Sequence, residues 1–364
     1  MLPPLPPEIF DLIVDNLHDE PIALKACCLV SKSWVPRARR NLFALVTFSS
    51  LRWPVRSWMN AFPNPSNSPA HHTRDLHFYD RSSVIAASTP NWVRHFRHTE
   101  ELRIANIAVD GSTAISFVRL QGLSPALKFL NLRSVSASLS EILNLICSFP
   151  LLDHLWLHFV TTWGDADECD IPSTSPRLTG SLNLLSRTRP ILRGLLNLPN
   201  GLHFAQITAC HVEYSESLVD LISRCSDTLE SLTVGFDSPM PGPLVLSEAT
   251  KLQDVKFECT GLSVRWIIAT LRTAKSTNLR KITITVASSA TLVDPIGETV
   301  YREWQDLDHL LDQLWTSRLI CPSVVYDENR VTSGLGGLVL SLLPRLASKG
   351  VVNGLGGYCQ RSEW

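Results

Sequence analysis

Residues 127–132 read LKFLNL, and this short phrase recurs along the chain. In each copy an apolar residue is followed by two variable positions, an apolar residue, one variable position and a third apolar residue. Clear copies begin at Leu127, Leu152, Leu229, Leu252 and Leu279, weaker copies at Thr73, Thr99 and Leu202, and a distorted copy spans 178–184. Successive copies start 23 to 28 residues apart. Because these intervals vary so little, they identify an internal repeat.

Between copies the apolar spacing changes from that of a strand to that of a helix. In SLSEILNLICSFP, residues 138–150, a serine cap precedes apolar residues on one helical face, and Pro150 ends the pattern. SESLVDLISRC (215–225) and SVRWIIATLR (263–272) repeat the arrangement. Because one strand and one helix cannot bury their apolar faces alone, the units are expected to stack into an α/β solenoid with a parallel sheet.

A (β/α)₈ barrel is the alternative that also alternates strands with helices. Barrel strands are buried on both faces and read as continuous apolar runs. Here the intervening positions are mostly polar, as in Asp254, Lys256 and Glu258, which favours the solenoid. The phrase and its spacing resemble leucine-rich repeats, although the asparagine that usually follows is missing from the clear copies. The resemblance implies an irregular, divergent solenoid over residues 73–350.

The third, fifth and seventh positions of each phrase are expected to point away from the helices, because strand side chains alternate between faces. In the first half of the repeat these positions carry aromatic, histidine and arginine side chains, which are enriched at protein interfaces. The predicted target-binding residues are His77, Tyr79, Phe129, Arg133, His154, Trp156 and His158. A competing interpretation is that a loop or the chain termini cover Phe129 and Trp156.

The N-terminal region concentrates apolar residues in two short stretches, LPPEIFDLIVDNL (5–17) and LVSKSWVPRARRNLF (29–43). Three helices are predicted: one beginning near Glu8, one capped by Asp19 and one capped by Ser31, with Pro36 delaying or bending the third. So small a unit cannot bury this much apolar surface within itself. A partner or the chain's own first repeat must cover it, and Leu42, Phe43 and Leu45 are expected to pack internally.

These residues resemble an F-box, especially that of a large fungal group with irregular repeats behind the box. The matching positions are Leu5, Pro6, Glu8, Ile9, Ile13, Leu17, Leu24, Val30, Ser31, Lys32 and Trp34. The resemblance implies binding to the Skp-type adaptor of a cullin–RING ubiquitin ligase, with the repeats capturing a protein target. It also implies the adaptor-binding residues, namely Leu5, Pro6, Ile9, Ile13, Leu17, Leu24, Val30 and Trp34. A scaffold with no role in ubiquitination is the alternative.

The expected organisation is an F-box at 1–48, a connecting segment at 49–72, the repeats with capping helices at 73–350 and a frayed tail at 351–364. The formal net charge of −1 gives no support to nucleic-acid binding. No leader or membrane span is recognised, so a cytoplasmic or nuclear protein is expected.

The nine cysteines form no C-x-x-C pair and are read as free thiols. Catalytic and nucleotide-binding motifs are absent, GLGG at 334–337 is read as a turn, and DADECD at 165–170 as an acidic insertion. Neither an enzymatic activity nor a cofactor or metal is predicted.

Overall fold

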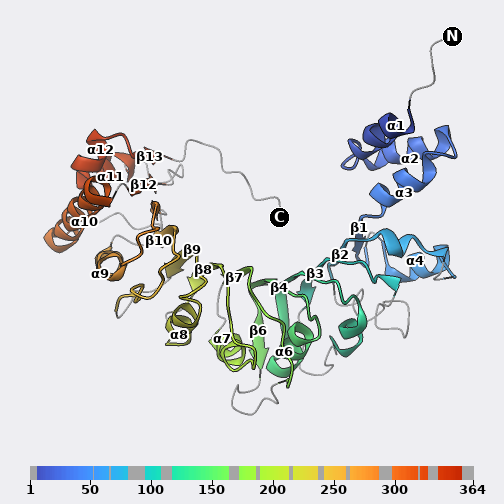
Figure 1. Cartoon of the computed structure of the whole chain (residues 1–364), viewed down its shortest axis with the longest axis horizontal. Coiled ribbons are helices and arrows are strands. Elements are labelled where there is room, and N and C mark those ends of the chain that lie inside the picture. Colours follow the sequence, from blue (N-terminus) through green and yellow to red (C-terminus); the bar gives the residue numbers. More distant parts are fainter. Residues whose placement is uncertain are drawn as a thin grey trace, which may run out of the picture. The chain divides into compact units, whose positions relative to one another are not determined.

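The structure is a computed structural model that describes residues 6–51, 53–64, 67–80, 95–107, 117–163, 172–185, 189–212, 216–236, 242–259, 263–286, 297–318, 320–326 and 335–354. The chain divides into two units, residues 1–177 with 197–200 and residues 178–196 with 201–364. Each unit has an α/β architecture and contains parallel strands in chain order (Figure 1). The predicted α/β class and the parallel pairing are confirmed.

Three short helices open the first unit: α1 (Pro7–Asp15), α2 (Pro21–Val30) and α3 (Val35–Leu42). Each carries proline in its first turn, where the missing N–H breaks no hydrogen bond. The third helix begins after Trp34 rather than after Ser31, because Pro36 is accommodated only at the start of a helix. The predicted cap at Asp19 is wrong, since Glu20 is the N-cap residue of α2 and its side chain accepts no capping hydrogen bond.

The strands of the first unit follow one another in the order β1 (Leu45–Phe48), β2 (Asp75–Phe78), β3 (Glu101–Ile107), β4 (Phe129–Ser138) and β5 (His154–His158). A short strand, β6 (Thr161–Trp163), pairs with the end of β4. The strands β2 to β5 begin two residues after the phrase starts at 73, 99, 127 and 152. Strand β1 was not predicted; it extends the sheet into the stretch assigned to the N-terminal helical region.

Helices and 3-10 turns cover one face of this sheet: α4 (Val55–Ala61), η2 (Pro69–His72), η4 (Phe117–Gly122) and α6 (Leu139–Cys147). The predicted serine cap of α6 is confirmed, because Ser138 and Glu141 form a reciprocal capping box. Beneath the first strands lies an aromatic core in which the Phe48 and Phe78 rings stack at 5.6 Å and Trp58 meets Phe48 edge-on at 5.7 Å. The described residues of the connecting segment therefore form part of the fold.

The strands of the second unit also pair consecutively and in parallel: β7 (Ser181–Leu185), β8 (Gln206–Val212), β9 (Ser231–Phe236), β10 (Asp254–Cys259), β11 (Lys281–Val286), β12 (Cys321–Tyr326) and β13 (Val352–Gly354). In Figure 1, α7 (Arg189–Leu196), α8 (Glu216–Arg224), α9 (Arg265–Thr273) and α10 (Glu298–Arg318) lie on one side of these strands. Among the described residues β1 pairs only with β2 and β13 only with β12, so the strand path is open and the barrel is excluded.

One repeat copy has a different register from the predicted one. Phe204 was expected on the face opposite the helices, but it is fully buried. Gln206 lies directly opposite Ser231, the third position of the next copy, so the phrase begins at Phe204 rather than Leu202.

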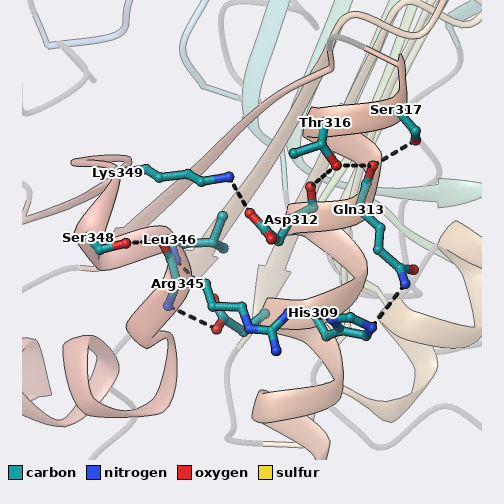
Figure 2. Close-up of polar contacts among 10 residues, drawn as sticks. His309, Asp312, Gln313, Thr316, Ser317, Arg345, Leu346, Ser348 and Lys349 are labelled. Carbon is teal, nitrogen blue, oxygen red and sulfur yellow. Dashed lines mark hydrogen bonds and ion pairs between the residues drawn. The ribbon is translucent and has the colours of Figure 1, made fainter.

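Helix α10 holds its neighbours α9 and α12 (Pro344–Ser348) through two acidic side chains. The Asp308 carboxylate accepts hydrogen bonds from the backbone N–H groups of Arg345 and Leu346, both at 3.0 Å. Glu303 accepts from the Val264 N–H at 3.3 Å and thereby caps α9. Figure 2 shows further contacts of α10 with α12 and the residue after it, among them the ion pair of Asp312 with Lys349. Both carboxylates satisfy helix N-termini that would otherwise lack acceptors.

The C-terminal capping region differs in detail from the prediction. The stretch LVLSLLPRLASKG (338–350) contains the end of α11 (Leu335–Leu342) and all of α12, which are separated at Leu343. The unpredicted strand β13 follows, and residues 355–364 lie outside the described residues. None of the helices in the described ranges has both the length and the apolar composition that crossing a membrane requires.

Candidate protein-interaction surfaces

The N-terminal helical segment, α1 to α3, has a very small core of its own. Four residues are buried in it, namely Val14, Leu24, Cys27 and Ala38, and Leu17, Cys28, Trp34 and Leu42 pack against them. Three predicted partner contacts, Leu17, Leu24 and Trp34, therefore take part in internal packing. Leu24 is 0% exposed, because α2 turns this side chain towards α3. The assignment of Leu24 to an exposed surface is corrected accordingly.

Most of the large aliphatic side chains of α1 and α2 are exposed, and we call these residues together the apolar face. Its members, with their exposed fractions, are Ile9 40%, Leu12 59%, Ile13 43%, Ile22 82%, Leu29 88% and Val30 67%. Ile9, Ile13 and Val30 were predicted to lie on such a surface; Leu12, Ile22 and Leu29 were missed, although Leu12 lies three residues from Ile9 on the same helical face. Pro6 is exposed, and Leu5 lies outside the described residues.

So many exposed aliphatic residues within two short helices require an explanation. Single exposed apolar residues are normal on a protein surface, but a cluster of them marks an interaction site or an aggregation hazard. The chain's own first repeat does not cover them. Of the residues expected to pack internally, Phe43 does so against Trp58, with ring centroids 5.8 Å apart, whereas Leu45 is exposed and that prediction is wrong.

A charged network holds α1 against α3 beside the apolar face. The Arg37 guanidinium donates from Nε to Asp15 Oδ1 at 2.7 Å and from Nη2 to Oδ2. Asn41 donates to Asp15 Oδ1 at 2.9 Å and to the Val14 carbonyl at 3.2 Å. The hydrogen bonds from Arg37 and then Asn41 lower the pKa of Asp15 to about 2. The helices are thus fixed relative to one another without using the apolar face.

The second candidate surface is the sheet face opposite the helices in the first unit, which we call the open face. Parallel pairing places Phe129 opposite His154, Asn131 opposite Trp156 and Arg133 opposite His158. The predicted residues of β4 and β5 are therefore neighbours on one face. The buried positions between them, such as Leu130 and Leu155, belong to the core on the other side.

Four of these side chains form an aromatic patch, defined by Phe129, His154, Trp156 and His158. The Trp156 ring meets Phe129 edge-on at 4.9 Å and stacks on His158 at 5.8 Å, and Phe129 lies 5.9 Å from His154. All four side chains are partly buried. The contacts just given are all made by neighbours on the same face. The partial burial of Phe129 and Trp156 therefore does not require a covering loop.

Polar atoms near this patch are buried without a hydrogen-bond partner. They include Trp156 Nε1 and Asn131 Oδ1, which lie on neighbouring strands at the same level, and His77 Nε2 on β2. Burial, and then the charge of Arg103, lowers the pKa of His77 to about 4, so this side chain is neutral at pH 7. Tyr79 is exposed and contacts the His77 ring at 6.1 Å. Unsatisfied buried polar groups are costly, and native proteins keep them mainly at functional positions.

The remaining candidates from the sequence are metal-binding groups, the cysteines and two loop segments. In the described ranges no group of three histidine, cysteine or acidic side chains is placed to hold a metal ion. Cys27, Cys210, Cys225 and Cys259 are buried free thiols, as predicted. The acidic insertion at 165–170 lies outside the described residues. The predicted turn at 334–337 is wrong from Leu335 onwards, because Leu335–Gly337 form the start of α11. No protein-family model matches the sequence, and neither does any curated protein.

Proposed function

We propose that the chain is the substrate-recognition subunit of a Skp–cullin–F-box ubiquitin ligase. The N-terminal helical segment is the F-box in this proposal, and the repeats behind it form a divergent leucine-rich-repeat-like solenoid that captures a protein target. The chain itself is then not an enzyme, and its partners are a Skp-type adaptor, through it a cullin–RING ligase, and an unidentified target.

The apolar face is the observation that carries the proposal. Fully burying one aliphatic side chain of this size contributes ~1.5–3 kcal/mol. Burying the six exposed residues would therefore release several times this free energy. In the proposal, a second protein buries them when it docks onto α1 and α2. The core of the segment has only four buried residues, so the segment does not bury these side chains by its own packing.

The resemblance to an F-box and the apolar face support each other, although they come from different observations. Ile9, Ile13 and Val30 are matched by the sequence pattern, and the same residues are exposed in the fold. Leu17, Leu24 and Trp34 also match the pattern but pack internally. In the proposal these three residues shape the box, and the exposed ones touch the adaptor.

The open face supports the other half of the proposal, the capture of a target. Large aromatic side chains at the centre of an interface typically carry most of the binding energy. The aromatic patch offers Phe129 and Trp156 as such anchors, with Arg133 and His158 beside them. In the described part of the chain, Trp156 Nε1 and Asn131 Oδ1 have no hydrogen-bond partner. Because a bound partner could supply one, we expect these side chains to rearrange when a target binds.

Co-purification tests the proposal and separates it from its alternative. A substrate receptor brings down both adaptor and cullin from a cell extract, and its target accumulates when the receptor is deleted. A scaffold with no ubiquitination role brings down the adaptor alone, and deletion leaves the level of its partner unchanged. Failure to recover any Skp-type adaptor contradicts both.

A further inference from the structure

A cavity of about 180 Å³ lies where the N-terminal helical segment meets the first repeat. Its lining is unusually rich in guanidinium groups: Asp15, Arg37, Arg40, Asn41, Ala44 and Arg74. Asp15 comes from α1, the next four from α3 and the residues after it, and Arg74 directly precedes β2. Ala44 contributes only a methyl group, which leaves room between the longer side chains.

The one carboxylate in the lining, that of Asp15, already accepts hydrogen bonds from other lining residues. Asp15 accepts both hydrogen bonds from Arg37 and one from Asn41. This bidentate contact uses Nε and Nη2 of Arg37 and leaves its Nη1 free of these bonds. Arg40 and Arg74 form no ion pair among the described residues. With three guanidinium groups against one carboxylate, the lining carries a net charge of +2.

Charged and titratable groups around the cavity modify this charge. Burial, and then the charges of His71, Arg40 and Arg39, lower the pKa of the neighbouring His72, which disfavours a positive charge on this imidazole. Asp11 lies near Arg37 and Asp75 near Arg74, but neither lines the cavity. The local excess of positive charge therefore remains concentrated on Arg40 and Arg74.

The backbone at both ends of the cavity is fixed. The Arg74 N–H donates to the Ala44 carbonyl at 2.8 Å, and the Arg74 carbonyl accepts from the Glu100 N–H at 2.8 Å. On the other side, Asn41 ties α3 to α1 through the Val14 carbonyl. A ligand entering the cavity therefore meets side chains that project from a preorganised frame, which lowers the entropic cost of binding.

We propose that this cavity binds a phosphate group through Arg40, Arg74 and the free edge of Arg37. The planar fork of guanidinium donors matches the oxygens of phosphate, and charge-assisted bonds of this kind are the strong ones. The bound group bridges α3 and the start of β2, and so couples the helical segment to the repeats. This site is distinct from both the apolar face and the open face, and it does not depend on the proposed function.

Isothermal titration of the full chain with inorganic phosphate, pyrophosphate and a short phosphoserine peptide tests the site. The expected result is saturable binding at one site, weakened about tenfold for each arginine removed, because a hydrogen bond to a charged group contributes about that much. The variants are Arg74→Gln and the double variant Arg40→Gln/Arg74→Gln. The matched control is Arg56→Gln, an exposed arginine on α4 outside the cavity.

The three probes distinguish the sources of the phosphate. Tighter binding of the phosphoserine peptide than of its unphosphorylated form and of inorganic phosphate identifies a modified protein segment as the ligand. Preference for pyrophosphate identifies a small phosphorylated molecule. The inference is overturned if none of the probes binds, or if the Arg74→Gln and double variants bind as tightly as the control. Arg74→Gln alone decides the question if the double variant does not fold.

Discussion

Leu24 and Val30 lie on the same helix, α2, but differ completely in exposure: Leu24 is 0% exposed and Val30 67%. Leu24 joins Val14, Cys27 and Ala38 in the core of the helical segment, whereas Val30 belongs to the apolar face. The two sides of α2 therefore differ in function. One side holds the segment together, and the other is available to a partner.

Replacing Leu24 is expected to destabilise the helical segment, whereas replacing Leu29 is not. Leu24→Ala leaves a cavity in a fully buried site and should cost ~2–5 kcal/mol. Leu29→Ala removes a side chain that is 88% exposed and should change stability by less than about 0.5 kcal/mol. Amide hydrogen exchange over residues 21–30 of the full chain measures the difference locally. Equal protection in the two variants would contradict the core assigned here.

The contact between Asp15 and Arg37 predicts a loss of stability in acid. The folded pKa of Asp15, about 2, lies below its ordinary value of 3.8, so the carboxylate stabilises the fold above pH ~4. This contribution is lost as the pH falls from ~4 towards 2. Melting temperatures across this window should therefore converge for the wild type and Asp15→Asn. Glu8→Gln, exposed on α1, is the control; curves for Asp15→Asn that stay parallel to the wild type would refute the prediction.

Asp308 is expected to hold α12 in place. The side chain is 2% exposed and accepts from two backbone N–H groups, so Asp308→Ala leaves both donors without this acceptor. Each unsatisfied buried donor costs ~1–3 kcal/mol. Faster hydrogen exchange at residues 344–348 is the expected result. Asp306→Ala, an exposed neighbour on α10, should leave exchange unchanged, and a similar effect from both variants argues against a capping role.

Trp156 is predicted to be an anchor for the target. Its ring is partly buried between Phe129 and His158, so Trp156→Ala should weaken target binding more than tenfold. The loss of stability should remain below the ~3–5 kcal/mol typical of a fully buried tryptophan. Target capture and a melting scan on the same sample measure both effects. Gln206→Ala, exposed on β8, serves as control. Retention of the target by Trp156→Ala would place the binding surface elsewhere.

The repeat phrase predicts the strands well because strand periodicity reflects burial on a single face. The phrase starting at Leu127 places β4 correctly, and the same holds for most copies. The copy at Leu202 failed because both Leu202 and Phe204 are apolar and buried, so apolar character alone does not fix the register. Strand β1 was missed because its phrase, starting at Phe43, directly follows a helical pattern and reads as its continuation.

The surfaces were harder to predict than the strands. Helix α1 is apolar on several sides, so its sequence does not reveal that Val14 is buried while Leu12 is exposed. Only the packing of α2 and α3 decides which side faces inwards. The cavity around Arg37 combines residues from α1, α3 and the start of β2, which are far apart in the sequence. Local spacing carries no information about such a juxtaposition.

The affinity of the full chain for a purified Skp-type adaptor is the decisive test of the proposed F-box. Val30→Glu places an unpaired carboxylate in the proposed interface, which typically costs ~3–5 kcal/mol, or more than a hundredfold in affinity. Ser57→Glu, exposed on α4, is the matched control. We expect the wild type and the control to bind the adaptor, Val30→Glu not to bind it, and all three to melt at the same temperature. Equal adaptor binding by Val30→Glu and the control, or no binding by the wild type, would contradict the proposal.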